Sequence, residues 1–349
     1  MKKFIFALVV AALVGPWASA LGKDARRLAP YPSLEELYQE ISSVAASRPE
    51  LVRLEIFGRS VEGKPLYLLR FGASAVRRKP QALVAAGIHA DEYIGPMVAL
   101  ALAKDLAGGH DLEAEQLLAQ VEIDIIPSLN PDGYARVYAD GGKGGEIGGR
   151  KNAHGVDLNR NFPLQPGAKS HHPLAGNRRP KSNYYMGESE LCEPESRAMA
   201  ELVKAGNYFI VLNLHSVAGK FLYPYTHTRK SAPDQQLFQE IGEAFAQAQK
   251  NYHYKVEQSY AWYPTLGDPD DYFYIWFGIP SFTIEIGRVS ANLLDRGLAT
   301  LKIFWMANPG KNYDYWIEND TPALVPAIAK AYELTAGKPL AAPRLEGKK

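Results

Sequence analysis

Four side chains that can bind a metal ion or move a proton stand at or just after the ends of apolar runs in this sequence: His89, Glu92, His215 and Glu285. A set of two histidines and one glutamate can hold a catalytic zinc ion and leave a fourth position for water. The spacing His-x-x-Glu lets His89 and Glu92 reach one ion from a single turn, and His215 offers the third ligand. Either histidine can instead be a core residue that donates to a carbonyl group, so the pattern alone leaves both interpretations open.

Two arginines, Arg150 and Arg160, lie in a polar stretch between these runs. A guanidinium group binds a carboxylate through two parallel hydrogen bonds. Two arginines in a loop are usually solvated charges. Beside the His and Glu set, however, they suggest a substrate with an anionic terminus.

The elements that must position these residues alternate between strand and helix patterns. Strands are expected at 51–58, 65–71, 82–88, 121–127, 207–214 and 281–286, and helices at 34–47, about 95–106, near 234–249 and about 322–335. This alternation predicts an α/β fold, a single-domain α/β/α sandwich around a mixed, mainly parallel twisted sheet. Ligands of such sheets bind beyond the carboxyl ends of the strands, so we expect the zinc site there. The stretch 130–190, with its glycine-rich part at 141–149, is expected to be a long irregular region.

The composition excludes several classes of protein. The chain has 349 residues, 39 Lys and Arg against 38 Asp and Glu, and one cysteine, Cys192. A net charge of +1 gives no general affinity for nucleic acid or for an anionic membrane. One cysteine excludes an internal disulfide and a cysteine-rich zinc finger. The 20 tyrosines fit a polar cleft or, equally well, half-buried strands.

The first 20 residues have the layout of a secretory signal peptide. Lys2 and Lys3 precede an apolar run at 4–14, and Ala18-Ser19-Ala20 forms an A-x-A cleavage site. The run is too short to span a bilayer as a helix. We therefore expect a secreted or periplasmic protein after cleavage near Ala20, without a stable membrane anchor.

Nine short stretches, in this order along the chain, carry a resemblance to a known family: Tyr31–Leu34, Gly58–Leu66, His89–Glu92, Asn130–Gly133, Asp157–Pro163, His215–Ser216, Tyr223–Tyr225, Trp262–Tyr272 and Phe282–Glu285. Together they resemble the zinc metallocarboxypeptidases of the carboxypeptidase A/B type. With the signal peptide at 1–20, the resemblance implies a catalytic domain at 28–337 and a polar tail at 338–349. It also implies a monomer that acts on peptide or protein C-termini and binds one Zn²⁺ per chain.

Within that family the motifs are closest to the regulatory N/E/D branch, as in an exported bacterial-type member. Two departures stand out. That branch carries a further β-sandwich domain, for which the residues after Glu285 are too few, and it tends to have Asp where this chain has Thr226. The catalytic resemblance starts about ten residues after the cleavage site. We therefore expect no propeptide, and we expect the enzyme to be synthesised in its active form.

The resemblance also implies a role for each site residue. His89, Glu92 and His215 would hold zinc, and Glu285 would be the general base. Arg150 would stabilise the oxyanion, Asn159 and Arg160 would bind the terminal carboxylate, Tyr263 would close over the substrate, and Asp157 would orient His89. Together these roles describe a zinc-dependent exopeptidase.

Asp270 falls without a gap on the position that forms the floor of the family's specificity pocket. Members with Asp there prefer C-terminal Lys or Arg, because a buried carboxylate pairs with a cation and not with an apolar side chain. Asp270 can instead point to solvent or cap the next helix. Three other functions are weighed against this one: a periplasmic peptidase for the γ-D-glutamyl–diaminopimelate bond of murein, a deacylase that shares the zinc set, and a binding module without activity.

Overall fold

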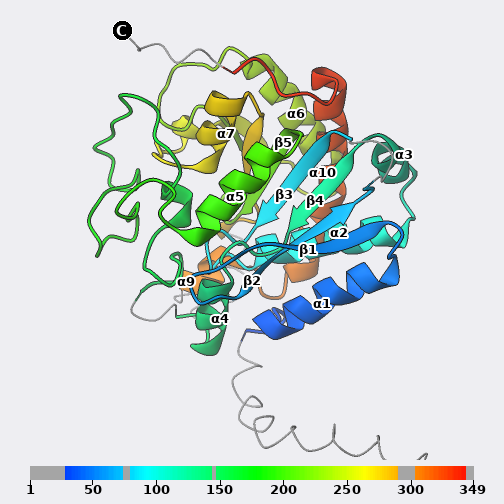
Figure 1. The fold of residues 1–349 in the computed structure, drawn as a ribbon, viewed down its shortest axis with the longest axis horizontal. Coiled ribbons are helices and arrows are strands. Elements are labelled where there is room, and N and C mark those ends of the chain that lie inside the picture. Colours follow the sequence, from blue (N-terminus) through cyan, green and yellow to red (C-terminus); the bar gives the residue numbers. More distant parts are fainter. Residues whose placement is uncertain (1–27, 74–78, 144–146, 290–302, 343–349) are drawn as a thin grey trace, which may run out of the picture.

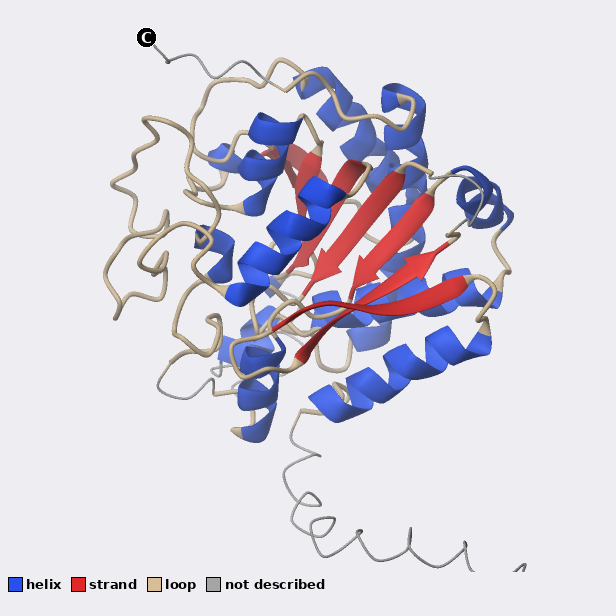
Figure 2. Ribbon diagram, in the orientation of Figure 1, coloured by secondary structure: helices blue, strands red, loops and turns tan. Residues whose placement is uncertain are grey.

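A twisted, mixed sheet of eight strands forms the middle layer of the molecule, and helices cover both of its faces (Figures 1 and 2). The computed structural model describes residues 28–73, 79–143, 147–289 and 303–342. The strands are β1 (Val52–Arg59), β2 (Pro65–Phe71), β3 (Gln81–Ala86), β4 (Glu122–Ile126), β5 (Tyr208–His215), β6 (Lys220–Tyr223), β7 (Lys255–Gln258) and β8 (Ser281–Glu285). Their order across the sheet is β1-β2-β4-β3-β5-β8-β6-β7.

The four central strands, β4, β3, β5 and β8, are parallel neighbours, so their carboxyl ends meet at one edge of the sheet. Strands β3, β4 and β5 are buried along their whole length, which is why they read as continuous apolar runs. On one side β2 joins β4 antiparallel, and on the other β6 joins β8 antiparallel. The predicted mixed and mainly parallel sheet is confirmed.

The helices form the two outer layers. They are α1 (Leu34–Ser47), α2 (Ile94–Gly108), α3 (Leu112–Gln120), α4 (Pro131–Ala139), α5 (Pro194–Ala205), α6 (Gln235–Ala248), α7 (Pro269–Phe277), α9 (Ile303–Ala307) and α10 (Tyr313–Thr335). Helices α5 and α7 pack on the near face of the sheet in Figure 1, around Val211 and Phe273. The other face carries the larger core, which includes α1, α2, α6 and α10. The predicted three-layer architecture is therefore present.

Several elements differ from the sequence-based expectation. The tail helix α10 begins at Tyr313 and not near 322, and it carries Pro322 and Pro326 in its interior, where proline usually ends a helix. Helices α3, α4, α5, α7 and α9 and strands β6 and β7 were not among the expected elements. Within 130–190 the structure has α4 and a 3-10 turn at Leu158–Arg160, and otherwise irregular chain. Residues 144–146 of the glycine-rich stretch lie outside the described residues.

The predicted signal peptide also lies outside the described residues, as does most of the predicted tail, from 343 onward. Both remain predictions, and so do the limits of the catalytic domain. Among the helices that the structure describes, none combines the length and apolarity that a membrane crossing requires.

The start of α1 offers a test of local stability. Ser33 Oγ accepts from the Glu36 amide at 3.2 Å and Glu36 Oε2 accepts from the Ser33 amide at 2.7 Å, which together form a capping box. We expect Ser33→Ala to lower the free energy of unfolding by about 1 kcal/mol. Thermal melting checks this, with Ser43→Ala in the exposed part of the same helix as the control. Equal losses in both variants would contradict a capping role.

Candidate functional site

Three potential ligands of a metal ion converge at the carboxyl edge of the sheet. His89 and Glu92 follow β3, and His215 is the last residue of β5. Nδ1 of His89 lies 2.8 Å from Glu92 Oε1, and Nδ1 of His215 lies 3.0 Å from Glu92 Oε2. The two Nδ1 atoms are 3.1 Å apart. Three ligands around one tetrahedral zinc ion are roughly 3.3 Å from one another, so the residues present fit such an ion.

This cluster is buried, and the charges in it depend on one another. Burial raises the pKa of Glu92, but the two adjacent imidazoles outweigh burial and hold that pKa well below its usual range. Burial lowers the pKa of His215. Among the described residues, these three are the one group of His, Cys, Asp and Glu side chains with ligand atoms within 4.8 Å of one another. A neutral imidazole and an ionised carboxylate are the forms that bind zinc.

Asp157 connects His89 to an arginine. Its Oδ1 lies 3.3 Å from Nε2 of His89, and its Oδ2 accepts from Nε of Arg150 at 2.7 Å. Burial raises the pKa of Asp157, yet Arg150 and Arg160 outweigh it and hold the pKa far below the usual range. The carboxylate is thus ionised and faces the ring nitrogen that points away from the convergent ligands. A partner in that place fixes the orientation of a ligating imidazole.

The two arginines lie on the same side of the site with different surroundings. Nη2 of Arg150 is buried and has no hydrogen-bond partner within the described chain. The Arg160 side chain is fully buried, and its Nη2 donates to the carbonyl of Leu174 at 3.0 Å. Asn159 stands beside Arg160 in the same 3-10 turn. The free Nη2 of Arg150 is a donor that a substrate oxygen can satisfy.

Glu285 and Tyr263 are two further residues that the sequence analysis assigned to the site. Glu285 is the last residue of β8 and pairs in register with His215 on β5, so the two side chains point to the same face. Burial raises the pKa of Glu285 well above its usual value, Glu92 adds to this, and Oε2 has no partner among the described residues. The hydroxyl of Tyr263 has its pKa raised by burial and lies close to Arg160, Arg150 and Glu285.

Asp270 lies on the face of the sheet that carries His215 and Glu285, and it contacts residues that precede these two on β5 and β8. It accepts from Asn213 Nδ2 at 2.7 Å, Ser281 Oγ at 2.8 Å and Thr283 Oγ1 at 2.6 Å. Asn213 stands two residues before His215, and Thr283 two before Glu285, which is about 7 Å of strand. Asp270 is only 2% exposed, so it does not point to solvent.

Nor does Asp270 cap α7, because the N-cap is Asp268. Thr226, one of the two departures from the family branch, donates its hydroxyl to Asp268 at 2.5 Å. Burial raises the pKa of Asp270 to about 7, and Asp268 contributes to the rise. Within the described chain no lysine or arginine pairs with Asp270, so its carboxylate is bound by neutral donors alone.

Tyr184 is a site residue that the sequence reasoning missed. The Cζ atoms of Arg150 and Arg160 lie 5.2 Å and 5.8 Å from the centre of its ring. The ring therefore lies near both guanidinium groups. No motif surrounds Tyr184 in the sequence, and the only signal was the high tyrosine content, which fitted half-buried strands equally well.

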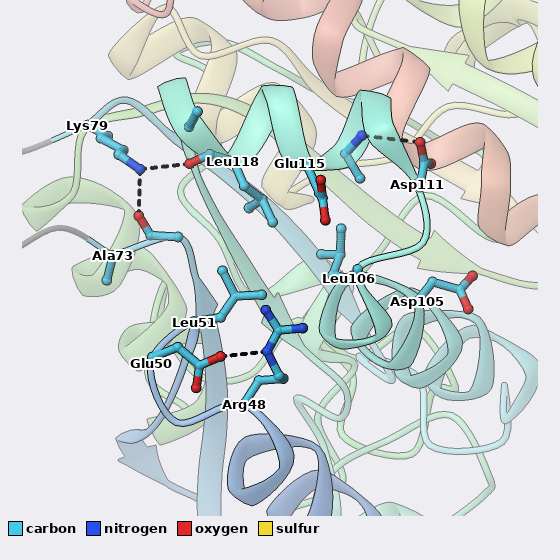
Figure 3. A pocket seen from close by; sticks show the side chains of 14 residues that line it. Arg48, Glu50, Leu51, Ala73, Lys79, Asp105, Leu106, Asp111, Glu115 and Leu118 are labelled. Carbon is cyan, nitrogen blue, oxygen red and sulfur yellow. Dashed lines mark hydrogen bonds and ion pairs between the residues drawn. The ribbon is translucent and has the colours of Figure 1, made fainter.

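A separate cavity of about 330 Å³ lies at the opposite edge of the sheet, near the start of β3 (Figure 3). Lys79 there donates to the carbonyls of Gly72 and Leu118, at 2.8 Å and 2.7 Å. Arg48 binds Glu50 at 2.6 Å. These cations are satisfied inside the protein. None of the predicted site residues lines the cavity, so it is separate from the cluster of His89, Glu92 and His215.

Comparison with known proteins agrees with this geometry. A family model described as zinc carboxypeptidase matches residues 37–305. Mouse carboxypeptidase A4 is 30% identical over 224 residues, covering 62% of this chain and 52% of its own. The human carboxypeptidase N catalytic chain is 32% identical over 243 residues, covering 61% and 51%. The chain thus spans about half the length of these curated relatives.

Solved structures agree on the fold. The crystal structure of thrombin activatable fibrinolysis inhibitor superposes with a TM-score of 0.70 and 24% identity, over 87% of this chain and 74% of that one. Carboxypeptidase A from Helicoverpa armigera also gives a TM-score of 0.70, with 22% identity over 86% and 74%. At this level of identity the likeness establishes the arrangement of the sheet and helices.

The contact between Asp157 and His89 yields a prediction about metal affinity. Asp157→Asn keeps the shape of the side chain but removes its charge, so we expect zinc to bind about 10- to 100-fold more weakly. Competition with a chelating dye measures this. Asp314→Asn, at an exposed position, is the matched control, and circular dichroism confirms that both variants fold. Unchanged affinity in Asp157→Asn would rule out the orienting role.

The position of Tyr184 yields a second prediction. Tyr184→Phe keeps the ring and is expected to bind a peptide with a free C-terminal carboxylate as the parent does. Tyr184→Leu loses two contacts between ring and cation and is expected to bind it several-fold more weakly. Calorimetry in a Glu285→Gln background measures binding without turnover. If Phe and Leu behave alike, the ring does not position the arginines.

Proposed function

This chain belongs to the zinc carboxypeptidase family, and we propose that it hydrolyses the C-terminal peptide bond of peptides or proteins, with a preference for C-terminal Lys or Arg. The observation that carries the proposal is the convergence of His89, Glu92 and His215 beside the unpartnered carboxylate oxygen of Glu285. The alternative of an inactive binding module is disfavoured because this constellation is complete. The family match likewise disfavours a deacylase.

Each residue of the site has a task in this reaction. Zinc held by His89, Glu92 and His215 would act as a Lewis acid toward the scissile carbonyl and lower the pKa of water. Glu285, whose pKa is raised, takes a proton from the attacking water and passes it to the leaving amine. The free Nη2 of Arg150 stabilises the negative oxygen that develops on the substrate.

The restriction to chain ends comes from the second arginine. Arg160, with Asn159, binds the terminal carboxylate, which an internal peptide bond does not have. Since Leu174 already accepts from the Arg160 side chain, the guanidinium is held in place before a substrate arrives. Tyr263 lies close to both arginines and covers the bound residue.

Asp270 supports the preference for a basic residue. A buried carboxylate held by three neutral donors has no cation of its own, and a lysine or arginine of the substrate supplies one. The ammonium group of diaminopimelate would meet the same carboxylate, so a murein peptide is the second candidate substrate. Export to the periplasm or the medium and a monomeric state complete the proposal and rest on the sequence.

A peptide panel tests this function. Matched peptides ending in Lys, Arg, Leu, Phe or Glu, their amidated copies and a murein tripeptide are incubated with the zinc-loaded protein, and products are read by mass spectrometry. We expect loss of C-terminal Lys and Arg, blocked by amidation and by a chelator. Glu285→Gln is expected to lower kcat by about 10²- to 10⁴-fold. Cleavage of the murein tripeptide alone would favour the murein peptidase function. Equal turnover by Glu285→Gln and the unmutated protein would refute the role of Glu285 as general base.

The same panel assigns Asp270. Asp270→Asn is expected to lower kcat/KM for Lys peptides by about 10²- to 10³-fold and to leave Leu peptides little changed. Because the pKa of Asp270 is raised to about 7, its carboxylate ionises as the pH rises from 6 to 8 while the substrate lysine stays charged. KM for Lys peptides should therefore fall over this range, and KM for Leu peptides should not. Removal of Leu and Phe in preference to Lys would show that Asp270 does not face the substrate.

A further inference from the structure

A long stretch beside the site carries positive charge without any negative charge. Residues 158–187 contain no Asp or Glu, although the whole chain is almost balanced, with 39 basic and 38 acidic residues. Apart from Arg160, the cations of this stretch are exposed: Lys169, Arg178, Arg179 and Lys181. We call these four residues the basic rim.

The charges of the basic rim are not neutralised by ion pairs among the described residues. Several exposed cations elsewhere pair with a neighbouring carboxylate, as Lys104 does with Glu40 at 2.8 Å and Arg48 with Glu50 at 2.6 Å. Within the described chain no ion pair involves any residue of the basic rim. Four uncompensated charges on one loop produce a local positive potential on a protein that otherwise has almost no net charge.

The charged tip of this loop is held in a defined turn. Asn177 accepts at its carbonyl from the Met186 amide at 2.9 Å and donates its own amide to the Tyr184 carbonyl at 3.0 Å. Its side-chain amide donates to Ser182 Oγ at 2.8 Å. Arg178 folds back and donates to the carbonyl of Gly187 at 2.7 Å. The turn therefore presents Arg179 and Lys181 on a fixed backbone.

The inner side of the same loop forms a wall of the catalytic site. Tyr184 lies against Arg150 and Arg160, and the carbonyl of Leu174 accepts from Arg160. The ring of His172 lies nearly parallel to that of Tyr263, with centres 6.1 Å apart. The loop, among the green segments that project beside α5 in Figure 1, thus contacts the site, while the four cations of the basic rim are exposed.

We propose that the basic rim binds acidic side chains of the peptide or protein substrate, upstream of the residue that is removed. The inference rests on the proposed function. A peptide that is bound by its C-terminus and leaves the site past this wall moves about 3.3 Å for each extended residue. We expect side chains a few residues before the scissile bond to contact Lys169, Arg179 and Lys181. The class of substrate is a chain with a basic C-terminal residue after an acidic segment.

Other anionic partners fit the structure less well. A nucleic acid or an anionic membrane is bound by charge spread over a face, and it gains from a high net charge of the whole protein. Here the charge is confined to one loop at the substrate site, and the net charge of the chain is +1.

Paired peptides test the proposal. Both members end in Lys, and they carry either Glu or Gln at the third to sixth positions before it. We expect the Glu peptide to have about 10-fold higher kcat/KM in 50 mM salt, and the difference to vanish in 0.5 M salt, where screening is strong. A triple variant, Lys169→Gln with Arg179→Gln and Lys181→Gln, should lose the preference. Arg178 is kept, because it holds the backbone of the turn.

A control variant removes the same number of charges elsewhere: Lys104→Gln, Lys255→Gln and Lys330→Gln. It should keep the preference for the Glu peptide. Dissociation constants in the Glu285→Gln background separate this proposal from the proposed function. One informative result is that the parent enzyme cleaves neither peptide while the Glu peptide still binds more tightly than the Gln peptide in a salt-sensitive way. That result would support the role of the basic rim and refute the proposed carboxypeptidase activity. Cleavage without discrimination, or discrimination that survives in the rim variant, would overturn the basic rim.

Discussion

The site depends on the contacts that the buried carboxylate of Asp157 makes with His89 and Arg150. The carboxylate faces His89 on one side and Arg150 on the other, so one negative charge connects the potential metal ligands to the arginine that can meet the substrate. A buried charge is tolerated only when it is paired and hydrogen-bonded. Without Asp157, the guanidinium of Arg150 would lose its Nε partner and the imidazole of His89 would lose the charge that faces its outer nitrogen. The spacing between metal site and substrate site is therefore set electrostatically.

The sheet supplies the second constraint. In parallel strands, residues two apart share a face, so β5 presents Asn213 and His215 in one row and β8 presents Ser281, Thr283 and Glu285 in the next. His215 and Glu285 stand at the carboxyl end of these rows, and Asn213, Ser281 and Thr283, farther back, bind Asp270. Strand geometry thus fixes the distance between the proposed general base Glu285 and the proposed selectivity carboxylate of Asp270.

The sequence predicted the fold well where burial leaves a periodic signal. Continuous apolar runs gave β3, β4 and β5, and the polar residues that end them gave His89 and His215. The capping box at the start of α1 also uses residue types, Ser33 and Glu36, whose spacing is visible in the sequence. Helix α4 was missed because Pro131 and Gly133 suggest a turn, although proline is tolerated in the first turn of a helix. Tyr184 was missed because its place beside two arginines depends on a return of the chain that no local pattern encodes.

The site draws on residues from His89 to Glu285, carried by strands that are neighbours in space but distant along the chain. A nascent or partly folded chain that lacks β8 has no Glu285, and one that lacks β5 has no His215. The proposed hydrolysis would therefore require the complete central sheet. A metal ion that needs all three ligands would also stabilise only the finished fold, since binding to the native state alone shifts the folding equilibrium toward it. Folding of the central sheet would thus have to be complete before the newly made chain could show the proposed activity.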